Sequence, residues 1–117
     1  MADPRKIEKD YPVNGGPGPI LLSIVIGDGQ IGASKVFLGN TRIAKGAIQH
    51  LPIGVPDQLR GQTLGIRTNV LDANPQTNHT SVTFIVTGGA VVEHDTLTFD
   101  APHDGDVIPY EAIFTFV

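Results

Sequence analysis

The chain of 117 residues has the size of one domain, and its 40% hydrophobic and 17% charged residues are typical of a folded protein. Its formal net charge of −4 argues against a nucleic-acid surface, because phosphate binding needs clustered Lys and Arg. Since there is no cysteine, disulfides, thiolate nucleophiles and zinc sites built on sulfur are excluded.

The charges are divided unevenly along the chain. All eight Lys and Arg lie in the first 67 residues, together with five acids, whereas the last 50 residues carry seven acids and no Lys or Arg. Such polarity predicts electrostatic assembly or the capture of a cation, but it does not by itself name a ligand.

The first 19 residues combine charged side chains with the Gly- and Pro-rich stretch 14–19, which cannot continue a helix and supplies few side chains to a core. We therefore expect a flexible N-terminal arm over 1–19 and a single β-sandwich domain over 20–117. The charged start lacks the apolar core of a secretory signal, so we expect a cytoplasmic location, with signal-independent export as the alternative.

From residue 20 onward, apolar residues alternate with polar ones at the period of a β-strand. Segment 20–26 is apolar on both faces, which predicts a central strand. In 63–71, Leu64, Ile66, Thr68 and Val70 share one face, which predicts a half-buried strand. The other strands are expected at 36–38, 41–45, 80–87, 91–99 and 110–117, and residues 50–61 are expected to form a loop.

Short strands separated by Gly, Pro, Asn and Asp turns predict an all-β fold, an antiparallel β-sandwich (Ig-like or jelly-roll-like) of about seven or eight strands. An α/β fold would need amphipathic segments between the strands. Only 32–37 and 42–49 could form short helices, and Gly39 and Gly46 limit both.

Gly27, Gly29 and Gly32 match the G-x-G-x-x-G spacing of dinucleotide-binding sites and follow a hydrophobic strand. That motif also needs a full crossover helix and an acidic residue about 20 positions onward. Here no acid occurs between Asp28 and Asp57. We therefore predict a hairpin with its turn at Asp28-Gly29, a pair that accepts positive φ readily.

The acidic half contains candidate binding residues. Carboxylates at short spacing are the ligands that Ca²⁺ prefers, and imidazole with carboxylate suits Zn²⁺ or Mn²⁺. A bound metal would make these residues its ligands, whereas the alternative is a solvated turn. The metal candidates are Glu93, Asp95, Asp100, His103, Asp104 and Asp106, and the polar loop 72–79 adds the ligand-binding candidates Asp72, Asn74, Asn78 and His79.

No serine lies in a Gly-x-Ser-x-Gly motif or beside an evident base, so we expect no catalytic residues and no cofactor, with Ca²⁺ left open. The expected function is a non-enzymatic binding or assembly module that acts through protein–protein contacts. Head-to-tail or two-fold self-association into a homo-oligomer would pair the opposite charges. The alternative is a lectin-like or divalent-cation-dependent ligand binder that uses the acidic loops.

Overall fold

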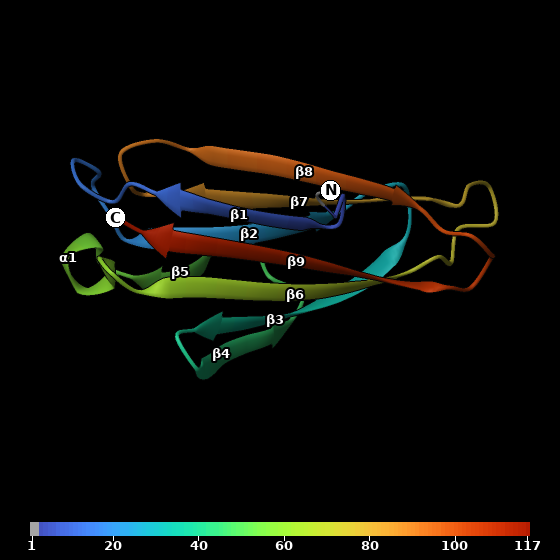
Figure 1. Cartoon of the computed structure of the whole chain (residues 1–117), viewed down its shortest axis with the longest axis horizontal. Helices are drawn as coiled ribbons and strands as arrows, with labels where there is room; N and C mark the ends of the chain where they lie inside the picture. The colour runs from blue at the N-terminus through green and yellow to red at the C-terminus, as the bar shows by residue number, and fades with distance from the viewer. Residues whose placement is uncertain (1–2) are drawn as a thin grey trace.

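The alternating segments form nine β-strands in two facing sheets in the computed structural model, which describes residues 3–117 (Figure 1). A single turn of helix lies between the fifth and sixth strands. The elements are β1 (Lys6–Tyr11), β2 (Ile20–Ile26), β3 (Ile31–Leu38), β4 (Thr41–Gly46), β5 (Leu51–Gly54), α1 (Pro56–Leu59), β6 (Thr63–Leu71), β7 (His79–Thr87), β8 (Glu93–Asp100) and β9 (Val107–Phe116).

The five-stranded sheet has the order β1-β9-β6-β3-β4, and the four-stranded sheet has the order β5-β2-β7-β8. Every neighbouring pair is antiparallel except β1 and β9, which are parallel. Among the described strands, only β3–β4 and β7–β8 are hairpins within one sheet, and the other connections cross between the sheets. The predicted β-sandwich is confirmed, and the predicted central position of segment 20–26 matches β2.

The core lies between the sheets and consists of the inward side chains of the alternating strands. Leu64, Ile66 and Val70 of β6 are fully buried, and so is the Thr68 that shares their face. The opposing sheet contributes Val82, Phe84 and Val86 of β7, and β9 adds Tyr110, Ala112, Phe114 and Phe116. Burial of this apolar surface is the main stabilising contribution to the fold, and it fixes which face of each strand points outward.

The expectation of a flexible arm over 1–19 is wrong for Lys6–Tyr11, which form β1 and pair with Glu111–Phe116 of β9. Residues 1 and 2 lie outside the described residues. Tyr11 and Val13 are fully buried, and the Tyr11 hydroxyl donates to the Val91 carbonyl at 2.5 Å. The strand was missed because Lys9 occupies an inward position and interrupts the apolar alternation.

Lys9 joins the edges of the two sheets. β1 ends the five-stranded sheet and β8 ends the four-stranded one. The Lys9 Nζ lies 2.8 Å from the Asp95 carboxylate and 3.3 Å from that of Glu93. These carboxylates are only 15% and 22% exposed, so the ion pairs form in a partly desolvated place. Inward charges also discourage the pairing of an edge strand with another chain.

The Asp28-Gly29 turn is confirmed, with φ of 59° and 69° and a hydrogen bond from the Gln30 amide to the Gly27 carbonyl at 3.2 Å. The predicted hairpin is wrong, because β2 and β3 belong to different sheets and the turn crosses between them. Gly32 lies within β3, so a strand follows the glycines where a dinucleotide site would have a helix.

The segment 50–61, expected to be a loop, contains β5 and α1. Its prolines led to the loop prediction, because proline is rare inside strands and helices. Pro52 sits in β5, an edge strand, where a missing N–H is tolerated, and Pro56 begins α1, where its fixed φ suits a helix start.

We predict that Lys9→Met lowers the free energy of unfolding by about 1–2 kcal/mol, because two partly buried carboxylates lose their shared cation. The hydrogen bond to Asp95 is the main cause of the raised pKa of Lys9, so its stabilising contribution is complete below pH 10.5 and is lost as the pH rises through the folded-state pKa. Urea unfolding measures the change. The control Lys45→Met, at an exposed position, should change stability by less than about 0.5 kcal/mol. Equal stability of the two variants would contradict the role of Lys9.

Candidate functional site: a basic trough and an acidic end

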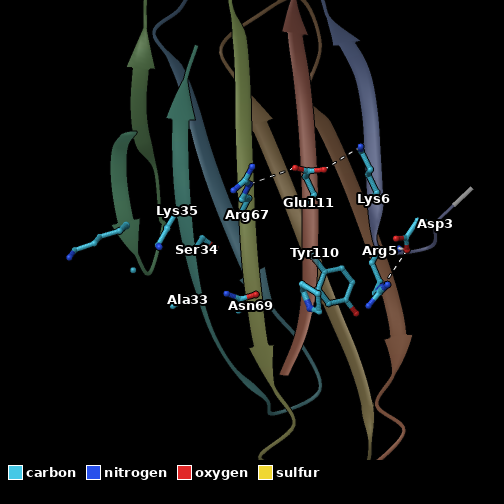
Figure 2. A pocket seen from close by; sticks show the side chains of 13 residues that line it. Asp3, Arg5, Lys6, Ala33, Ser34, Lys35, Arg67, Asn69, Tyr110 and Glu111 are labelled. Carbon is cyan, nitrogen blue, oxygen red and sulfur yellow. Dashed lines mark hydrogen bonds and ion pairs between the residues drawn. The ribbon is translucent and has the colours of Figure 1, made fainter. Parts of the chain in front are cut away.

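A row of charged side chains crosses the outer surface of the five-stranded sheet. The strand register places Lys6 opposite Glu111, Glu111 opposite Arg67, Arg67 opposite Lys35, and Lys35 opposite Lys45. The charged row therefore contains one residue from each of the five strands, four cations and one anion. Figure 2 shows Lys35, Arg67, Glu111 and Lys6 side by side on their strands.

The single acid of the charged row is shared by the two cations beside it. The Glu111 carboxylate lies 3.3 Å from the Lys6 Nζ and 3.7 Å from the Arg67 Nε. Among residues 3–117, neither Lys35 nor Lys45 has a carboxylate within ion-pair distance. Lys35 and Lys45 therefore leave an uncompensated positive potential at one end of the row, and these like charges on adjacent strands repel each other.

The charged row borders an open hollow of about 790 Å³, which we call the basic trough. The next row of the sheet face lines it with side chains that carry no charge: Ala33, Asn69 and Pro109. Asp3 and Arg5, which pair with each other at 3.2 Å, line it from the N-terminal segment beside β9 (Figure 2). Five of the eight Lys and Arg of the chain line the trough, against two acids: Arg5, Lys6, Lys35, Lys45 and Arg67, with Asp3 and Glu111.

A smaller hollow of about 350 Å³ lies on the other side of Arg67. Gly65 opens it, since a β-carbon there would meet only the Phe37 Cβ, at 4.0 Å. The Arg67 guanidinium lies 5.9 Å from the centre of the Phe37 ring. Arg67 therefore stands between two depressions of the same sheet face, where its exposed end can contact a partner in either.

The trough was not predicted from the sequence. Lys35, Lys45 and Arg67 each follow or precede an apolar residue of a strand, which signals that they point outward, but this alone does not tell which strands are neighbours. The excess of basic residues before residue 68 was the available signal, and the sheet order converts it into a surface.

The opposite kind of charge collects at one end of the sandwich, where the β2–β3 turn and the loops after β6 and β8 meet (at the right in Figure 1). Gln30, 8% exposed, organises this end. Its side-chain oxygen accepts from the amides of Ala73 and Asn74, both at 2.8 Å. Its nitrogen lies 2.9 Å from the Asp72 carboxylate, and it also reaches the carbonyls of Thr77 and His79. The buried side-chain amide of Gln30 thus fixes the conformation of the 72–79 loop.

The four predicted ligand-binding residues lie together at this acidic end, but their polar groups bond to the protein. Asp72 is buried beside Gln30, and Asn74 donates to the Asp28 carbonyl at 2.8 Å. The amide nitrogen of Asn78, when turned toward the carboxylates, donates to Asp72 at 3.0 Å and to Asp104 at 2.5 Å. The His79 Nδ1 lies 2.5 Å from the Asp100 carboxylate. These contacts shape the loop.

The six predicted metal ligands are dispersed. Glu93 and Asp95 bind Lys9 between the sheets, whereas Asp100 and Asp104 contact the 72–79 loop. Asp106 accepts from the backbone amide of His103 at 3.0 Å, which makes it a turn-forming side chain. Within residues 3–117, no three His, Asp or Glu side chains are grouped so that they could hold a metal ion. The six residues therefore do not form one metal centre.

No protein-family model matches the chain, and neither the curated proteins nor the solved structures contain a match to it. In the described part of the chain, none of the helical structure reaches the length and apolar character that crossing a bilayer requires.

We predict that Gln30→Ala destabilises the protein by about 2–4 kcal/mol, because the buried Asp72 carboxylate and several backbone groups lose their partner. Hydrogen exchange at the amides of Ala73 and Asn74 should accelerate. Gln76→Ala, at an exposed position in the same loop, is the matched control, with an expected change below about 0.5 kcal/mol. Unchanged exchange at both amides in Gln30→Ala would contradict the organising role of Gln30.

A second prediction concerns His79, whose pKa is raised above 6.5, chiefly by its hydrogen bond to Asp100 and further by the charge of Asp28. A raised pKa means that this contact stabilises the fold below pH 6.5 and that the contribution disappears as the pH rises through the folded-state pKa. Asp100→Asn should lower the pKa of His79 in an NMR titration, whereas Asp106→Asn should leave this pKa unchanged. Equal effects of the two variants would refute the pairing.

Proposed function

We propose that this protein is a binding and assembly module that docks an acidic protein surface in the basic trough. The observation that carries the proposal is the uncompensated charge of Lys35 and Lys45, which stand beside Arg67 on a rigid sheet without a carboxylate partner among the described residues. A partner carboxylate there would relieve the repulsion between these cations, and this relief would stabilise the complex.

The pattern of charges favours a protein partner over a polyphosphate chain. The order across the strands is one cation, one anion and then three cations, and Glu111 would repel a uniformly negative chain near the middle of the row. A protein surface can place its carboxylates opposite Lys35 and Lys45 and a neutral or basic group opposite Glu111. The row spans five strands, about 20 Å, which is wide enough for a loop or an extended segment.

The trough also resembles the rim of an interface more than a small-molecule site. Ligand sites for small molecules are enclosed and lined by apolar and aromatic side chains, whereas the trough is open and most of its charged side chains are exposed. Exposed charges contribute mainly to the rate and selectivity of association between proteins.

We predict that a glutamate-rich peptide, with its glutamates confined to one half and only uncharged residues in the half that would lie opposite Glu111, binds the protein at low salt. Lys35→Gln with Lys45→Gln should weaken this binding about 2- to 30-fold, the effect of two exposed ion pairs. Isothermal titration calorimetry measures the affinity. Affinity should fall as salt rises from about 50 mM to about 500 mM, because screening removes interactions of this kind.

Arg60→Gln, which removes a cation outside the trough, is the control and should keep the affinity of the unchanged protein. A lysine-rich peptide of the same length should not bind if the electrostatic potential of the trough is positive. Equal binding of the acidic peptide to the control and to the trough variant would refute the proposed docking site.

A further inference from the structure

An exposed apolar row lies on the same outer face as the trough. The strand register places Ile31 opposite Leu71, and Leu71 opposite Val107, on β3, β6 and β9. These side chains are 62%, 38% and 58% exposed. Single exposed apolar residues are ordinary, whereas three that adjoin on one sheet face form a surface on which a partner could pack.

Three features follow one another along the strands of this face. The apolar row comes first, the uncharged residues Ala33, Asn69 and Pro109 form the next row, and the charged row is third. Rows on one face are about 6.6 Å apart, so the apolar and charged rows are separated by about 13 Å. On the other side of the apolar row, Leu71 leads into the 72–79 loop, and the loop that carries the exposed Asp104 leads into Val107.

We propose that two copies of this chain form a dimer by packing the outer faces of their five-stranded sheets about a two-fold axis. This inference rests on the proposed function and names the acidic partner as a second copy. The axis passes between the apolar row and the row of Ala33. The apolar row of each copy then covers the row of Ala33, Asn69 and Pro109 of the other, and the charged row of each copy meets the Asp104-bearing end of the other.

The two-fold arrangement brings both the apolar row and the charged row of the sheet face into contact with the other copy. A single rotation covers both apolar rows in the centre and pairs opposite charges twice at the periphery, which is the usual anatomy of an interface. From the acidic end to the charged row the contact extends about 20 Å along the strands and at most about 24 Å across them, or about 480 Å² per partner. A standard interface buries about 800 Å² per partner, so we expect a weak dimer that forms at high protein concentration.

The first test compares two substitutions of exposed valines in sedimentation velocity across a range of protein concentrations. The unchanged protein should sediment as a species of twice the 12.4 kDa chain mass at low salt and high protein concentration. Val107→Asp, in the apolar row, should weaken dimerisation by at least about tenfold. Val92→Asp is the matched control, because Val92 is 68% exposed and lies in the β7–β8 connection at the other end of the sandwich.

The second test exchanges charges between the two regions. Lys35→Glu and Asp104→Lys should each abolish dimerisation alone, since each creates like-charge pairs. An equimolar mixture should recover a dimer containing one copy of each variant, because every cross-interface pair is then opposite in sign. A head-to-tail arrangement would give larger alternating assemblies in the same mixture, so the sedimenting mass decides the symmetry. Arg60→Glu, with the same change of charge as Lys35→Glu, should still dimerise.

A monomeric unchanged protein at every concentration would overturn the dimer, and so would equal weakening by Val107→Asp and Val92→Asp. These outcomes are separable from failure of the proposed function. A monomer that binds the glutamate-rich peptide through Lys35 and Lys45 would retain the docking site and reject the second copy as its partner. A dimer that Val107→Asp disrupts, but that neither charge variant weakens, would retain an apolar contact and reject the role of the trough.

Discussion

The register of the five-stranded sheet is the constraint on which the rest of this structure depends. In β6, every second side chain is buried, so slipping the strand by one residue would place Arg67 and Asn69 in the core and expose Leu64 and Ile66. The core therefore permits one alignment of β3, β6 and β9. That same alignment sets the outward side chains in rows across the strands, and both the charged row and the apolar row follow from packing on the opposite face.

The N-terminal segment completes both the sandwich and the trough. Lys9 and Tyr11 fasten β1 to the region of β8, and without β1 the acid of the charged row would lose Lys6. The connection from β1 to β2 also passes very close to the β7–β8 turn. A β-carbon on Gly88 would lie 2.1 Å from the Pro19 carbonyl oxygen, so only glycine allows this crossing. The N-terminal segment thus both stabilises the edge of the five-stranded sheet and shapes the trough.

The carboxylates of the acidic end bond mostly to groups of the protein itself. Their oxygens are taken by an amide network centred on Gln30, by His79 and by backbone groups of the turns. The remaining exposed charge, such as that of Asp104, gives this end a negative potential that complements the trough. The division of charge along the sequence becomes a division in space, because the strands that carry the bases are neighbours in one sheet.

The sequence by itself determined the inward faces of β6, β7 and β9, since the alternation of apolar and polar residues in these strands reports burial directly. It also determined the turn at Asp28-Gly29, whose positive φ angles are a local property. Only the tertiary structure decided which strands are neighbours, that Lys9 is an inward ion-pair partner rather than part of a flexible arm, and that Glu93 and Asp95 are the carboxylates it contacts. Those facts depend on contacts between residues distant in the chain, which the period of a strand does not encode.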